Sequence, residues 1–326
     1  MNVREKFLQL TSKTYPHPAE TQVLEFLPDD LTRDKYGNYY KIIGESKSIF
    51  ASHLDTADRT QGIVNHVFET DENGDEWVAT DGSTILGADD KSGVCVLLYM
   101  MEHNIPGIYY FFIGEEVGLI GSGKVSQDFE SFDHLQEVER IISFDRRGFK
   151  SIITNQMGRY CCSDDFANYL IGEYGNVGLE MEQDPGGVYT DSAIFMDVIP
   201  ECTNISVGYF HEHSGKECQN LSFLEDLCEA CIKVDWENAP TSRKVTIDDN
   251  LYTEKEDIIE YIKGLDTVND LNIYEDNGRV CMALTVEDPS NATLLTEVEA
   301  IISGFDKYGV ESYTEIEDDI IKIYLV

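Results

Sequence analysis

The chain has 326 residues, of which 42% are hydrophobic and 11% aromatic, so it can form about two domains with packed cores. Its 62 acidic and 24 basic residues give a formal net charge of −38. This charge repels phosphate backbones and anionic lipid surfaces, so we expect neither nucleic acid nor a membrane as a partner. The N-terminal residues lack the apolar core of a signal peptide, and the eight cysteines form no disulfide framework, so we expect a cytoplasmic protein.

The first 240 residues alternate short apolar runs with helical patterns, which predicts an α/β sandwich around a mostly parallel sheet. The runs that predict buried strands are 47–56, 107–116, 140–148 and 201–214. Helical spacing is found at 92–104, 163–176 and 221–239. The segment 62–82 contains Asn73-Gly74 between two runs in which apolar and polar residues alternate, which predicts a β-hairpin.

The pattern changes near residue 240, and the order that follows is strand, helix, hairpin, helix, strand. This βαββαβ order is typical of a ferredoxin-like fold. We therefore predict a catalytic domain at 1–240 and a small C-terminal α+β domain at 241–326. The predicted C-terminal elements are a strand at 243–247, a helix at 253–265, a hairpin at 271–286, a helix at 292–309 and a strand at 319–326.

Each predicted strand of the first domain ends in side chains that bind metals or protons well. In open α/β sheets, ligands bind beyond the carboxyl ends of the strands, so we expect these side chains to meet in one crevice. A loop that opens directly into a helix adds the pair Asp89-Asp90. The strand-end residues are His53, Asp55, Glu115, Glu116, Asp145, His211 and His213.

This set of side chains suits a pair of divalent metal ions. Two histidines and several carboxylates are zinc ligands, and paired ions share a bridging carboxylate. One ion could be held by His53, Asp89 and Asp145. The other could be held by Asp89, Glu116 and His213. Asp55 and Glu115 then remain beside the two ions.

Six stretches resemble the co-catalytic zinc exopeptidases, the superfamily that contains peptidase T, bacterial zinc aminopeptidases and carboxypeptidase G-type enzymes. They occur in the family's order between about residues 30 and 230, and together they are highly specific. The stretches are DKYGNYY, ASHLDT, DGSTILGADDKSG, FIGEEVGLIGS, FDRRG and VGYFHEHSGKE.

The resemblance implies a three-layer zinc-exopeptidase-like α/β/α domain with the metal ligands given above. It implies that Asp89 bridges the two ions and precedes a cis peptide bond to Asp90. Glu115 would be the general base, and Asp55 would accept a hydrogen bond from His53. We prefer His213 to His211 because the Ser-Gly-Lys-Glu that follows it resembles the family's His-Ser/Thr-x-x-Glu.

The chain departs from peptidase T in one respect, because only 68 positions separate Asp145 from His213. That is too few for the lid domain that peptidase T inserts there, so single-domain zinc aminopeptidases are the better comparison. We therefore expect a hydrolase that cleaves a peptide bond, first of all an aminopeptidase, with two zinc ions or with cobalt or manganese. The expected substrate is a peptide or a small amino-acid derivative, and a homo-oligomer is left open.

Two alternatives remain at this point. The first is an N-acyl amino-acid or carboxypeptidase-type amidohydrolase on the same site. Separately, Arg146 and Arg147, which follow a candidate ligand, could meet a substrate carboxylate or could merely neutralise the acidic site. The second is a non-catalytic binding protein that retains the fold.

Overall fold

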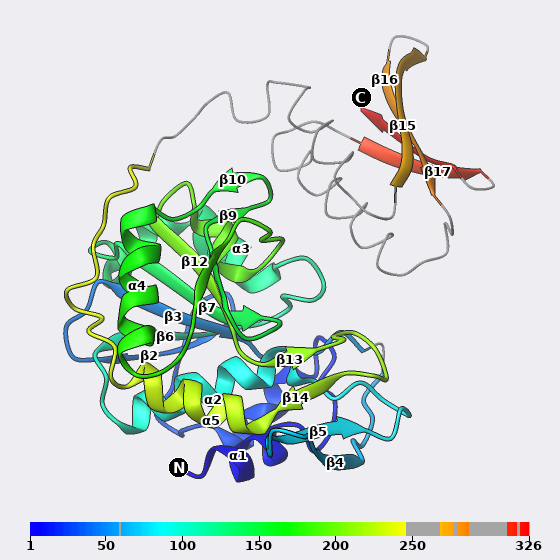
Figure 1. Cartoon of the computed structure of the whole chain (residues 1–326). Coiled ribbons are helices and arrows are strands. Elements are labelled where there is room, and N and C mark those ends of the chain that lie inside the picture. Colours follow the sequence, from blue (N-terminus) through cyan, green and yellow to red (C-terminus); the bar gives the residue numbers. More distant parts are fainter. Residues whose placement is uncertain (59, 246–267, 277–278, 287–311, 318–319, 326) are drawn as a thin grey trace. The chain divides into compact units, whose positions relative to one another are not determined.

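A computed structural model describes residues 1–245 except 59, together with 268–276, 279–286, 312–317 and 320–325 (Figure 1). The chain divides into two compact units, Met1–Thr246 and Ile247–Val326. Each unit is described by itself below.

A mixed sheet of eight strands forms the centre of the first unit, in the order β1-β2-β6-β3-β7-β12-β8-β11. Strand β3 pairs in parallel with β6 and β7, and β7 pairs in parallel with β12, which confirms the predicted mostly parallel sheet. All residues of β3, β6 and β12 are buried, as expected for strands that are covered on both faces. The strands are β1 (Thr32–Arg33), β2 (Tyr39–Ile43), β3 (Ser48–His53), β6 (Gly107–Phe112), β7 (Arg140–Arg146), β8 (Ser151–Ile153), β11 (Glu182–Asp184) and β12 (Glu201–Ser206).

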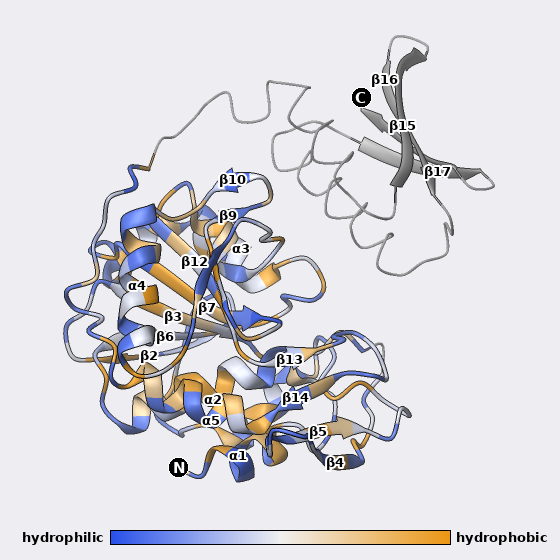
Figure 2. Ribbon diagram, in the orientation of Figure 1, coloured by the Kyte–Doolittle hydropathy of each residue, from blue (hydrophilic) through white to orange (hydrophobic). Residues whose placement is uncertain are grey.

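A hydrophobic core lies on each face of this sheet. Along β6, Tyr109 and Phe111 belong to one core, whereas Ile108, Tyr110 and Phe112 belong to the other, because successive strand residues point to opposite faces. In Figure 2 hydrophobic colours are found on inner strands and helices of the first unit, whereas many loops carry hydrophilic ones. The first core is completed by α1 (Val3–Leu10), α2 (Ala88–Glu102), α4 (Asp164–Asn176) and α5 (Leu221–Cys231), and the second by α3 (Ile120–Gln127) and three 3-10 helices (Phe129–Ser131, Asp133–Leu135 and Asp191–Phe195).

The described part of the chain contains free thiols, and its helices can be compared with what a bilayer requires. Cys228 and Cys231 are buried in the core on α5, and the seven cysteines with described side chains are free thiols. Within the described residues, none of the helices has both the length and the apolar character that crossing a bilayer requires.

A second, antiparallel sheet of the first unit has the order β13-β14-β5-β4. The pairing of β4 (His66–Thr70) with β5 (Glu76–Thr80) confirms the predicted hairpin. The other two strands are β13 (Tyr209–Phe210) and β14 (Cys218–Asn220).

The single strand predicted over 201–214 is wrong in its second half. Strand β12 ends at Ser206, and Gly208 at φ 91° turns the chain before the short β13. His211 and His213 then have φ values of 58° and 59°, which no strand contains.

The second unit contains an antiparallel sheet in the order β15-β16-β18-β17. The pairing of β15 (Val268–Asp276) with β16 (Arg279–Val286) agrees with the predicted hairpin, and β18 (Ile320–Leu325) with the predicted last strand. The sheet also includes β17 (Ser312–Glu317), which was not predicted. The two predicted helices lie outside the described residues, as does the end of the predicted strand at 243–247, of which residues 243–245 are not in a strand. The ferredoxin-like order stays a prediction.

Candidate active site

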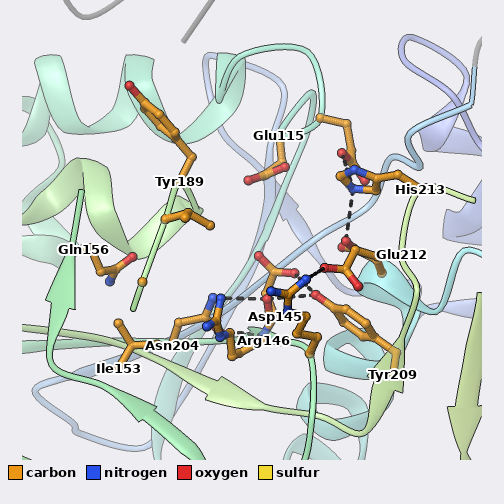
Figure 3. A pocket seen from close by; sticks show the side chains of 15 residues that line it. Glu115, Asp145, Arg146, Ile153, Gln156, Tyr189, Asn204, Tyr209, Glu212 and His213 are labelled. Atoms are coloured by element: carbon orange, nitrogen blue, oxygen red, sulfur yellow. Dashed lines mark hydrogen bonds and ion pairs between the residues drawn. The ribbon is translucent and has the colours of Figure 1, made fainter. Parts of the chain in front are cut away.

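The predicted site residues meet at the carboxyl end of the central sheet. His53 ends β3, Glu115 and Glu116 follow β6, and Asp145 lies near the end of β7. Asp89 opens α2, and the chain after β13 brings in His213. Of these six residues, all except the buried His53 line one cavity of about 120 Å³, where Figure 3 shows Glu115, Asp145 and His213 facing each other.

Asp89 lies between the two histidines. Its Oδ1 atom is 3.0 Å from His53 Nε2, and its Oδ2 atom is 3.2 Å from His213 Nε2. On the first side, Asp145 Oδ1 is 3.7 Å from His53 Nε2, and on the second, Glu116 Oε2 is 3.1 Å from His213 Nε2. The structure thus brings these five side chains together around Asp89.

The spacing of these atoms fits divalent metal ions. Zinc binds nitrogen and oxygen at about 2.0–2.2 Å, so two ligands of one tetrahedral ion lie about 3.3–3.6 Å apart. The four distances given above lie close to that range. In addition, Glu116 Oε1 is buried and has no hydrogen-bond partner among the described residues. His53 with Asp89 and Glu116, and His53 with Asp90 and Asp145, each place one potential ligand atom per residue within 4.8 Å of the others.

Both carboxylate oxygens of Asp90 accept hydrogen bonds from backbone N–H groups. Its Oδ1 atom accepts the N–H of Gly93 at 3.0 Å, and its Oδ2 atom accepts the N–H of His53 at 3.3 Å. The peptide bond between Asp89 and Asp90 is cis, as the resemblance implies. Asp90 therefore joins the start of α2 to the end of β3.

Asp55 connects two of the predicted motifs. Its Oδ1 atom lies 3.3 Å from His53 Nδ1. The same carboxylate accepts the N–H of Glu115 at 3.0 Å and that of Glu116 at 3.1 Å. The buried Lys91 donates to the Asp55 carbonyl oxygen at 3.0 Å and so fixes the backbone of this residue. Asp55 thus holds the Glu115-Glu116 turn, and it faces the imidazole of His53, whose Nδ1 atom has no hydrogen-bond partner among the described residues.

The carboxylates of this cluster are hard to ionise together without a cation. Burial raises the pKa of Glu115 well above its usual range. Burial and the Asp89 charge raise the pKa of Asp145 to about 6, and burial with the Asp145 charge raises that of Asp191 to about 7. Because metal binding displaces protons from ligands, bound cations would release these protons.

Three residues that support the ligands were not assigned a role from the sequence. Thr190 Oγ1 donates to Asp145 Oδ2 at 2.9 Å, and the Tyr209 hydroxyl donates to Asp145 Oδ1 at 3.2 Å. The buried Glu217 accepts three backbone N–H groups, from Leu86 and Gly87 at 2.8 Å and from Asp89 at 3.0 Å. Glu217 ends the stretch VGYFHEHSGKE, so the family pattern could have pointed to it.

We expect Glu217→Gln to lower both the stability and the metal affinity of the protein. The amide has one acceptor oxygen and an NH₂ group that would face a backbone donor, which costs about 1–3 kcal/mol of unfolding free energy. Because the loop also positions Asp89, the zinc affinity should fall by about 10–100-fold. Thermal melting and zinc titration of the metal-free protein measure the two effects. Glu225→Gln on the exposed side of α5 is the matched control, and wild-type values for both readouts in Glu217→Gln would contradict this role.

Arg146 and Arg147 both line the cavity, and both have acidic partners. Arg146 Nη2 donates to Asp184 Oδ2 and to the carbonyl oxygen of Gly186, each at 3.1 Å. Arg147 Nη1 donates to Glu212 Oε1 at 3.2 Å. Arg146 thereby holds the turn at Gly186 against β7, while Arg147 lies at the more exposed rim.

The sequence is similar to known protein sequences over only a short part of its length. No family model matches the chain. The uncharacterized protein YqjE of Bacillus subtilis (strain 168) is 45% identical over 80 residues, which are 22% of this chain and 20% of that protein. The chain thus matches about a fifth of this curated relative.

Solved structures are similar over most of the chain. Aminopeptidase PepT from Bacillus cereus ATCC 10987 has a TM-score of 0.58 at 15% identity and covers 72% of this chain and 98% of its own. The TET1 peptidase of Pyrococcus horikoshii, which can assemble into a tetrahedron or a large octahedral shell, has a TM-score of 0.52 at 18% identity, with 72% and 99% covered. The chain therefore has the fold of peptidase T and the TET peptidases and carries a candidate His/Asp/Glu metal site in it.

Proposed function

We propose that the protein is a dinuclear metallopeptidase and that it acts as an aminopeptidase. The observation that carries this proposal is the position of Asp89, whose two carboxylate oxygens face two different histidines at 3.0 and 3.2 Å. A carboxylate in this position is suited to bridge two ions, as in two-metal hydrolases. His53 and Asp145 would complete one ion's ligands, and Glu116 and His213 the other's. Zinc is the ion that this mixture of ligands suits first, with cobalt or manganese as substitutes.

When bound, two such ions lower the pKa of a shared water molecule and polarise the scissile carbonyl group. Glu115 lines the cavity, and its Oε2 atom is 4.0 Å from His53 Nε2, so it would be placed to accept a proton from an attacking water molecule and to donate it to the leaving amine. Asp55 accepts the backbone N–H of Glu115 and faces His53, so it would fix the position of the candidate base, Glu115, relative to the candidate ligand, His53. These are the roles that we assign to the two residues.

Two features favour an aminopeptidase over other peptidases. One is the aspartate at position 145, which matches many aminopeptidase relatives, together with the short span from there to His213. The other is the similarity in fold to aminopeptidase PepT from Bacillus cereus. Arg147 at the rim of the cavity favours the second candidate, an N-acyl amino-acid or carboxypeptidase-type hydrolase, because a guanidinium group binds carboxylates.

Metal analysis and a substrate panel test the proposal. We expect close to two zinc ions per chain in protein that was purified without chelators. We also expect hydrolysis of amino-acid p-nitroanilides and little hydrolysis of N-acyl amino acids, with activity lost after dialysis against a chelator and restored by zinc. Activity only on N-acyl amino acids would favour the second candidate. Absence of bound metal would favour a binding protein.

A further inference from the structure

The cavity contains one acidic side chain that the proposed reaction does not use. Of the carboxylates that line it in the described part of the chain, Asp89, Glu116 and Asp145 are candidate ligands and Glu115 is the candidate base. Glu212 is the remaining one. In Figure 3 it lies next to His213 among the side chains that line the cavity.

The backbone around Glu212 is built so that two neighbouring side chains reach the same cavity. In a strand, residues 212 and 213 would point to opposite sides. Here His211 and His213 have left-handed φ values of 58° and 59°, and both Glu212 and His213 line the cavity. Left-handed backbone at residues other than glycine costs free energy and is found where the surrounding structure requires it.

Only one of the two oxygens of the Glu212 carboxylate accepts a hydrogen bond within the described residues. Its Oε1 atom accepts from Arg147 Nη1 at 3.2 Å, which fixes the side chain in place. Its Oε2 atom is buried and has no hydrogen-bond partner among the described residues. An ionised carboxylate accepts on both oxygens, so an unpaired oxygen calls for a donor from outside the chain.

We propose that Glu212 binds the α-ammonium group of the substrate's N-terminal residue, with Arg147 as the residue that positions it. This inference rests on the proposed aminopeptidase function and names the group by which that site selects its substrate. An ammonium group supplies the missing donor and a charge opposite to that of Glu212. A carboxylate is a poorer fit, because both guanidinium groups at the cavity already have acceptors and Glu212 would repel it. The site should therefore discriminate against peptides with a blocked N-terminus.

The test compares a substrate that has the amine with one that lacks it. In the zinc-loaded full chain, we would measure kcat/KM for leucine p-nitroanilide and for 4-methylpentanoyl p-nitroanilide, its des-amino analogue. The wild type should prefer the amine substrate, and Glu212→Gln should reduce this preference by about 10–100-fold, the range for loss of a hydrogen bond between charged groups. Glu180→Gln is the matched control, because it removes an exposed carboxylate that is likewise paired with a cation, Lys150, at 3.1 Å.

Binding measurements separate failure of this inference from failure of the proposed function. Calorimetry should give tighter binding of leucinamide than of 4-methylpentanamide to the wild type, and Glu212→Gln should lose that difference. If neither anilide is hydrolysed but this binding pattern is found, the proposed peptidase function fails and the role of Glu212 stands. The inference is overturned if Glu212→Gln keeps the wild-type preference in both assays, or if the wild type has none. A last contradicting result concerns N-acetyl-leucine, which has a carboxylate but no free amine. If Arg147→Met abolishes the binding of N-acetyl-leucine while Glu212→Gln leaves ligand binding unchanged, the cavity binds a carboxylate through Arg147 and the inference is overturned.

Discussion

Glu115→Gln is expected to reduce kcat on an amino-acid p-nitroanilide by about 10²–10⁴-fold, the usual contribution of a general acid–base group. The amide keeps the shape of the side chain but cannot take a proton from water. The backbone N–H of residue 115 would still donate to Asp55, so the turn that carries Glu116 should keep its position. Steady-state kinetics measure the loss in kcat.

Metal analysis makes this experiment specific for the base. Because Glu115 is not one of the five candidate ligands, Glu115→Gln should bind the same number of zinc ions as the wild type. Glu72→Gln, on the exposed turn of the β4–β5 hairpin, is the matched control. Full activity in Glu115→Gln would contradict the mechanism, and loss of zinc together with activity would make Glu115 a ligand instead.

Asp89→Asn is expected to have the broader effect, because it removes the only carboxylate that faces both histidines in the described part of the chain. An amide offers a single oxygen and no negative charge, so it cannot hold two cations together. We expect fewer than two zinc ions per chain. Since bound ions contribute several kcal/mol to stabilising the transition state, we also expect a loss of about 10³-fold or more in kcat.

The control for Asp89→Asn is the same change at an exposed position, Asp226→Asn on α5. Elemental analysis and zinc titration of the metal-free protein give the stoichiometry and the affinities. Two zinc ions bound with wild-type affinity in Asp89→Asn would show that another residue bridges them or that the two sites are independent. Loss of a single ion with the other unchanged would assign Asp89 to one ion alone.

The α/β character of the first unit and its hairpin could be predicted from local patterns. Fully apolar runs such as β3 and β6 indicate strands that are buried on both faces, and Asn73-Gly74 indicates a tight turn. The residues at the ends of these strands could be predicted to converge, because parallel strands carry their carboxyl ends to the same edge. The convergence of the candidate metal ligands at the ends of β3, β6 and β7 follows from these two arguments.

Features that depend on long-range contacts could not be predicted in this way. The run after β12 has the composition of one long strand, but Gly208 and the left-handed residues at 211 and 213 divide it, since this part of the chain must turn to reach Asp89 and Glu116. The family pattern could point to Glu217 but not to its contacts, because the segment before β14 packs against the loop before α2, which lies about 130 positions earlier in the chain.

The net charge of −38 illustrates the same division. The sequence by itself determined that the protein is strongly acidic, that it has an α/β domain and that a few strand-end carboxylates and histidines could bind cations. Only the tertiary structure decided which carboxylates have partners within the chain and which do not. Asp55, Asp90 and Glu217 accept backbone N–H groups, whereas Glu116 and Glu212 each keep a buried oxygen without a partner among the described residues. The physical reason is that a hydrogen bond depends on position and direction, which residue type and spacing along the chain do not specify.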